Sequence, residues 1–193
     1  MASIVFVKSN PARKRVQIGI DDGGETTVLK VRESTYSSLG APTRGSEITD
    51  GALESLRADD ELLRAYARAV SWLADADRSR YELKKKLLQL GIRHEIADTV
   101  LDKCEQYGYL DEERQLERLV EREANRKLRG RYYIRRKLAS KGYRTSAIDR
   151  VTDLLVERGE IDFGANLERL AEKRGVSDET ELAALRYRYG YES

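Results

Sequence analysis

The sequence is poor in the residues that most enzymatic and metal sites need. Cysteine and histidine occur once each in 193 residues, and proline occurs twice. A single cysteine, Cys104, excludes an intramolecular disulfide, and without a cluster of cysteine and histidine there is no zinc site. Gly23 and Gly24 do not belong to a phosphate-binding G-x-x-x-x-G-K-[ST] loop. We therefore expect no enzymatic activity, no metal and no cofactor.

Long apolar runs are also missing. No N-terminal stretch reaches the length of a signal peptide or a membrane span, so we expect no membrane partner and a cytoplasmic protein. We also expect a monomer. His94 lies near an expected helix start and is interpreted as a helix-terminal residue.

Charge is plentiful and unevenly placed. Charged residues make up 36% of the chain, yet the formal net charge is only +2. Between residues 122 and 144 there are ten basic residues and one acidic residue, Glu123. This local concentration predicts a basic patch, whereas the whole molecule is too nearly neutral to indicate nucleic acid or membrane.

The chain repeats itself with a period of 51 residues. The stretch 78–111 matches 129–162 without a gap and with twelve identical pairs, and a third copy begins at LERLAE, 167–172. Such a period is typical of stacked helical units, which offer long surfaces to large partners. We predict the segments 1–58, 59–110, 111–161 and 162–193, the last being a truncated third unit.

Each unit is expected to contain three helices, over 61–74, 79–90 and 95–107 in the first copy. Ser79 and Glu82 form a capping box at the start of the second helix. Four matched glycines end helices in both copies: Gly91, Gly108, Gly142 and Gly159. Apolar positions repeat on one face of the second and third helices, namely Leu83 and Leu87 with Ile134 and Leu138, and Val100 and Cys104 with Val151 and Leu155. Cys104 is therefore interpreted as a small buried apolar residue.

The first part of the chain follows a different pattern. Alternating apolar residues over 3–33, with a turn at 21–24, predict a small antiparallel sheet before the mainly α-helical body. Helix is expected to resume from Asp50. The sheet is interpreted as a packing cap on the first unit, in preference to an independent binding site.

Basic residues repeat on the second helix of each unit. The second helix of the second copy, 131–141, contains no acidic residue. Because like charges held close together cost free energy, we infer an anionic partner, either an acidic protein surface or phosphates. The candidate partner- or DNA-binding residues are Arg78, Arg80, Lys84, Lys85, Lys86, Arg129, Arg131, Arg135, Arg136, Lys137, Lys141 and Arg144, and Arg93 matches Arg144.

Tyrosines accompany these charges. Tyr81 and Tyr132 match and are expected to be half-buried, while Tyr187 lies near the C-terminus. Arginine beside tyrosine suits nucleic acids as well as protein interfaces. A non-specific DNA-binding module of the helix-turn-helix type therefore remains an alternative, although the absence of Asn and Gln among the basic residues of the second helix disfavours base reading.

Several of these segments resemble the RecX family of regulatory proteins. The resemblance lies in DRSRYELKKKL at 77–87, in Gly91-Ile92 and in GYLDEER at 108–114, and it continues through Gly130, 136–138, 141–143 and Ile148. It covers residues 60 to 191. The resemblance implies tandem three-helix units that bind the RecA filament on single-stranded DNA, inhibit its ATPase, strand-exchange and coprotease activities, and act in DNA repair, homologous recombination and the SOS response. Weak direct DNA binding is compatible with this role.

The third copy departs from the family pattern. Gly190 lies 48 rather than 51 residues after Gly142, and the copy ends before a full third helix. Contacts that the family makes through its final helix are therefore not expected here.

Overall fold

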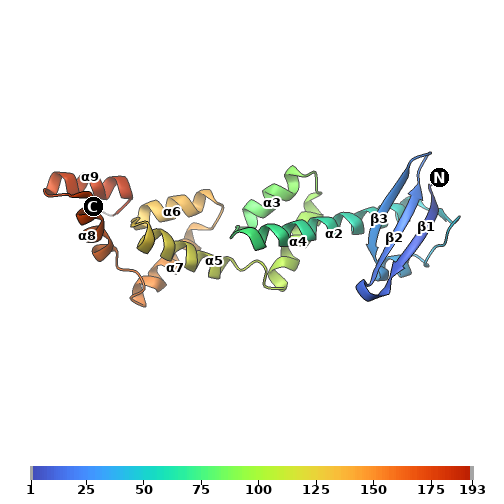
Figure 1. Cartoon of the computed structure of the whole chain (residues 1–193), viewed down its shortest axis with the longest axis horizontal. Coiled ribbons are helices and arrows are strands. Elements are labelled where there is room, and N and C mark those ends of the chain that lie inside the picture. The colour runs from blue at the N-terminus through green and yellow to red at the C-terminus, as the bar shows by residue number, and fades with distance from the viewer. Residues whose placement is uncertain (1, 192–193) are drawn as a thin grey trace. The chain divides into compact units, whose positions relative to one another are not determined.

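The computed structural model describes residues 2–191. A small N-terminal sheet is followed along the chain by helices (Figure 1). The N-terminal elements are β1 (Ala2–Asn10), η1 (Pro11–Arg13), β2 (Arg15–Asp21), β3 (Thr26–Arg32), α1 (Glu33–Ser38), β4 (Glu47–Ile48) and α2 (Asp50–Asp75). They are followed by α3 (Arg80–Gln89), α4 (His94–Gln106), α5 (Glu112–Glu121), η2 (Arg122–Arg126), α6 (Arg131–Ser140), α7 (Thr145–Glu157), α8 (Phe163–Arg174) and α9 (Glu179–Tyr189). The chain forms two compact units, Met1–Trp72 with Lys86–Gln106, and Leu73–Lys85 with Tyr107–Ser193.

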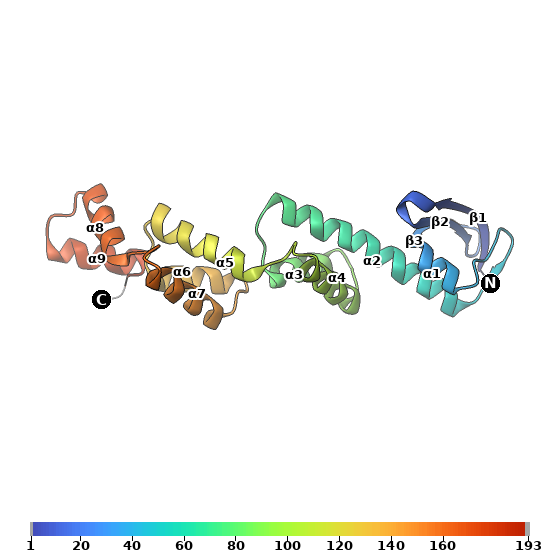
Figure 2. The same cartoon turned by 90° about the horizontal axis from the view of Figure 1, so that it is seen from below.

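The N-terminal sheet is antiparallel, as predicted, with strand order β3-β2-β1-β4. The turn after β2 is closed by Asp21, whose side chain accepts a hydrogen bond of 2.7 Å from the amide of Gly24. One face of the sheet is apolar and packs on Leu53 and Leu56 of α2. Figure 2 shows α1 and the first part of α2 on this side of the sheet. The sheet thus has its own core.

This core also explains where the first long helix begins. α2 begins at Asp50, where helix was expected to resume, and it runs without a break into the predicted helix 61–74, because its first turns carry the apolar residues that cover the sheet. The predicted boundary between residues 58 and 59 consequently falls inside α2.

The edge of the sheet at β3 is protected by two buried aspartates of α2. Asp60 accepts a hydrogen bond of 2.8 Å from the amide of Lys30, and Asp59 accepts one of 2.6 Å from the amide of Arg32. An unpaired edge strand would otherwise present these amides to another strand. Asp59 also forms an ion pair with the Arg32 guanidinium at 2.5 Å.

The helices end at the glycines that the sequence predicted as helix ends. Gly91, Gly108, Gly142 and Gly159 all have φ between 70° and 87°, the left-handed region that glycine enters without strain. The predicted capping box is present at α3: the amide of Glu82 donates to the Ser79 hydroxyl at 3.1 Å, and the amide of Ser79 donates to Glu82 at 3.2 Å.

The predicted apolar stripes are confirmed. All eight positions are at most 2% exposed: Leu83, Leu87, Val100, Cys104, Ile134, Leu138, Val151 and Leu155. Burial raises the pKa of the Cys104 thiol to about 11, which disfavours the reactive thiolate at neutral pH. Cys104 is thus a core residue, as the repeat indicated.

Candidate partner-binding surface

Three of the candidate basic residues on α6 are neutralised within their own unit. Arg131 forms an ion pair with Asp153 of α7 at 2.5 Å, and Arg135 forms one with Asp149 at 3.0 Å. Lys137 donates to Glu123 of η2 at 2.8 Å. The lack of acidic residues within α6 itself therefore does not imply a full set of unpaired charges, because α7 and η2 supply the counterions.

Glu123 is the centre of this arrangement. Its carboxylate is 1% exposed and also accepts a hydrogen bond of 2.8 Å from Lys127. Burial raises the pKa of this carboxyl, but the hydrogen bonds from Lys127 and Lys137 outweigh burial and hold the pKa below its usual value.

Arg129 lies inside the unit rather than on an open face. Its guanidinium stacks between the rings of Tyr133 and Tyr189, 4.4 and 4.5 Å from their centroids. Its Nε atom is buried without a hydrogen-bond partner among the described residues, as is that of its repeat equivalent Arg78. These two arginines are positioned to support packing at the helix starts.

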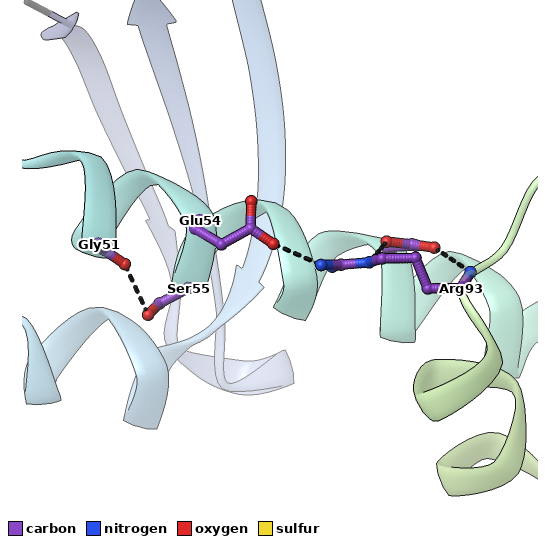
Figure 3. Close-up of polar contacts among 5 residues, drawn as sticks. Gly51, Glu54, Ser55 and Arg93 are labelled. Atoms are coloured by element: carbon purple, nitrogen blue, oxygen red, sulfur yellow. Dashed lines mark hydrogen bonds and ion pairs between the residues drawn. The ribbon is translucent and has the colours of Figure 1, made fainter.

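In the first copy, two of the matching basic residues also contact side chains of their own unit. Lys86 lies over the ring of Trp72, 4.8 Å from the centroid. Arg93 binds two glutamates of α2: it forms an ion pair with Glu54, and its Nε donates to Glu61 at 2.9 Å (Figure 3). These hydrogen bonds raise the pKa of Arg93. In the same view the Ser55 hydroxyl donates to the carbonyl of Gly51, one turn earlier in α2.

Four candidates remain available to a partner. Lys85 on α3 and its repeat equivalent Arg136 on α6 are exposed, Lys141 follows α6, and Arg144 precedes α7. No carboxylate of the described residues forms an ion pair with any of them. We call Lys85, Arg136, Lys141 and Arg144 the open basic set. Arg80 and Lys84 are half-buried, and each takes part in an interaction of its own.

The tyrosines differ from expectation. Tyr81 and Tyr132 are 56% and 61% exposed rather than half-buried. Each is the second residue of its helix. Tyr143 is instead buried, and its hydroxyl donates to Gln115 at 2.9 Å. Burial raises the pKa of Tyr143. The exposed rings therefore add to the surface that a partner can contact.

The same kind of contact occurs twice between the start of one helix and the end of another: residues 79–81 contact 141–142, and residues 130–133 contact 189–190. We call this contact the repeated joint. The Ser79 hydroxyl donates to the carbonyl of Lys141, and Gly142 lies against Tyr81. One repeat later the amide of Gly130 donates to the carbonyl of Tyr189 at 2.9 Å, and Gly190 lies against Tyr133. Gly190 thus takes the place of Gly142 despite the shorter spacing, a correspondence that the sequence repeat alone left ambiguous.

We expect Ser79→Ala to lower the free energy of unfolding by about 1–2 kcal/mol, since it removes both the helix cap and the bond to Lys141. Chemical denaturation measures this change. Ser79→Thr keeps the hydroxyl and should recover much of the loss, and Ser71→Ala on an exposed turn of α2 should be nearly neutral. Equal effects at Ser79 and Ser71 would contradict the assigned role.

Neither a metal site nor a membrane span is found in the part of the chain that the structure describes. No group of three or more metal-ligating side chains occurs there. None of the helices combines the length and the apolar character that crossing a bilayer requires.

Known proteins are similar to this chain in sequence and in fold. A family model described as RecX, first three-helix domain, matches residues 65–104. A regulatory protein RecX from Bacillus mycoides is 29% identical over 132 residues, which is 68% of this chain and 48% of that protein. One from Geobacillus is 23% identical over 99% of this chain and 72% of that protein. The chain therefore spans about half the length of the first relative and most of the second.

A solved structure supports the same fold. The crystal structure of a regulatory protein RecX superposes with a TM-score of 0.73 at 21% identity, covering 100% of this chain and 96% of that one. The architecture and the repeated joint define a tandem three-helix-repeat protein preceded by a small sheet. In sequence and in fold, the chain is similar to the RecX family of regulatory proteins.

Proposed function

We propose that this protein is a non-catalytic, cytoplasmic and monomeric regulator of RecA. It binds the RecA filament on single-stranded DNA and inhibits ATP hydrolysis, strand exchange and coprotease activity. Similarity to the RecX family carries this proposal. Inhibition needs no chemistry, because a protein that binds one filament state better than another shifts the population by that difference in affinity.

The open basic set is the surface that we assign to this contact. Lys85 and Arg136 are repeat equivalents that both remain exposed, whereas the neighbouring Arg135 and Lys137 are held by Asp149 and Glu123. Cations without an internal counterion gain most from an anionic partner, because they give up no existing ion pair on binding. We therefore place the contact at the open set and not at the paired residues.

The test is a titration of RecA ATPase activity on single-stranded DNA. We expect the R136E/K141E/R144E variant to need about tenfold more protein for half-inhibition, a loss of ~1.4 kcal/mol of binding free energy. A control with the same change in net charge at Arg44, Arg68 and Arg114 should inhibit like the native chain. Equal inhibition by both variants and the native protein would remove the open basic set from the mechanism.

A second candidate function is DNA binding without RecA. It is favoured by the exposed rings of Tyr81 and Tyr132 near cations, since bases stack on such rings. Binding to bare and to RecA-coated single-stranded DNA, compared at two salt concentrations, separates the two functions. Tighter binding to bare DNA would support the second candidate and contradict the first.

A further inference from the structure

A second basic surface lies on the N-terminal sheet, far in sequence from the open basic set. Two hollows of about 540 and 560 Å³ border the β1–β2 hairpin, and Arg13 and Arg15 line both. The first is also lined by Lys8 of β1, Lys30 of β3 and Arg64 of α2. The second is also lined by Lys14.

Strand register brings these side chains together. Lys8 pairs with Gln17, which pairs with Lys30, so the three form one row across β1, β2 and β3. The next row on the same face is Asn10, Arg15 and Arg32. Cross-strand neighbours on one face lie about 5 Å apart. The sheet therefore aligns its basic residues on the face opposite the apolar core.

Most of these cations have no internal counterion. Arg32 is paired with Asp59, and Arg64 with Asp60. No described carboxylate forms an ion pair with the other five, which are Lys8, Arg13, Lys14, Arg15 and Lys30. Asp21, Asp22 and Glu25 lie at the other hairpin, where Asp22 is paired with Arg57 at 2.9 Å, while Asp60 lines the first hollow and Glu33 the second. The sheet is thus electrically polarised along its strands.

The hairpin presents its charges from an ordered turn. The Asn10 side chain accepts a hydrogen bond of 3.2 Å from the amide of Arg13, and Pro11 occupies the first position of η1. Lys14 closes the turn with φ of 49°, and its carbonyl accepts the amide of Glu33 at 3.1 Å. Because the backbone is fixed in advance, a ligand need order only the side chains.

We propose that this surface binds the phosphodiester backbone of a single-stranded nucleic acid. The five cations are spread over one face of the sheet and its hairpin, beside two hollows, which suits a chain of phosphates better than one small phosphate ester. Two hollows on either side of one hairpin suit a flexible single strand better than the rigid rod of a duplex. The half-buried ring of Phe6 lies beside these charges, with the Lys8 ammonium 5.5 Å from its centroid.

The test measures fluorescence anisotropy of a labelled 20-nucleotide oligothymidine with the full chain. We expect R13Q/K14Q/R15Q to bind about tenfold more weakly and to lower the slope of log affinity against log salt by about 2, since each phosphate contact on a single strand contributes about 0.7. K8Q/K30Q changes the sheet without touching the turn and should lower the slope by about 1.4. A control, Arg44, Arg114 and Arg126 each changed to Gln, should leave the slope unchanged.

Other outcomes would overturn the proposal. An unchanged slope in both variants would show that these cations do not contact phosphates. An equal fall in the control would show that only net charge matters. An equal loss of duplex binding would indicate a general anion surface, and displacement of the oligonucleotide by polyglutamate as readily as by polyphosphate would indicate an acidic protein. The measurement contains no RecA, so its result does not depend on the proposed regulatory function.

Discussion

Replacing Gly130 by alanine is expected to separate the start of α6 from the end of α9. A Cβ atom at residue 130 would lie 2.2 Å from the carbonyl oxygen of Gly190 and 2.4 Å from the amide nitrogen of Tyr191. Both are backbone atoms, so neither can rotate away, and the helices must move apart. Overpacking of this kind costs about 1–3 kcal/mol.

The same movement breaks two hydrogen bonds. The amide of Gly130 donates to Tyr189 at 2.9 Å, and the amide of Tyr132 donates to Gly190 at 3.0 Å. Each contributes about 1 kcal/mol. We therefore expect a loss of about 3 kcal/mol in the docking of α8 and α9, where Leu128 packs with Leu170 and Leu185.

Amide hydrogen exchange measures this loss locally. Protection should fall in α8 and α9 and stay unchanged in the sheet. Gly51→Ala is the matched control: Gly51 lies in α2, nothing is within 4 Å of its added Cβ, and alanine favours a helix, so we expect neutral or slightly higher stability. Native protection of α8 and α9 in the Gly130 variant would refute the steric role of this glycine.

Local rules in the sequence predicted most of the fold. The capping box at Ser79 and the helix-ending glycines depend on residues only a few positions apart, and the structure confirms them. The return to helix at Asp50 was expected, but the continuity of α2 from Asp50 to Asp75 was not, because it depends on packing beneath the sheet, a contact between segments distant in sequence.

The candidate site was harder to predict for the same reason. The basic repeat identified which residues carry charge, but whether a charge is open depends on other helices. Arg135 and Arg136 are neighbours in sequence, yet only Arg135 faces Asp149 of α7. One feature of the sequence could have shown that some of these charges are paired. Glu123 is the single acidic residue in a basic run, and Lys127 lies at the i+4 position that favours an ion pair on a helix.

Replacing Glu123 by glutamine should destabilise the unit that contains α5, α6 and α7 by about 2 kcal/mol. The amide keeps the shape of the side chain, but its NH₂ group faces one of the two lysine ammonium groups and cannot accept its proton. Hydrogen bonds to charged groups contribute about 1.5–3 kcal/mol, and breaking a buried pair costs about 3–5 kcal/mol. We expect the lower end because Lys127 and Lys137 are 48% and 31% exposed and can turn to water. Urea unfolding measures the change, with Glu121→Gln, an exposed neighbour, as the control expected within about 0.5 kcal/mol of the native protein.

The dependence of the free energy of unfolding on pH in the acid range provides a second, independent test of Glu123. The pKa of its carboxyl is lowered in the folded protein, so the unfolded chain binds the proton more readily. The stabilisation is therefore fully present above the unfolded pKa of about 4.3 and is lost as the pH falls through the lower folded value. Glu123→Gln cannot titrate, so its stability should fall less steeply than that of the native protein below about pH 4.3, and the two curves should converge in acid. Parallel curves down to the lowest pH would show that the ion pairs of Glu123 do not stabilise the fold, and the lysines that it holds would then be as available to a partner as Arg136.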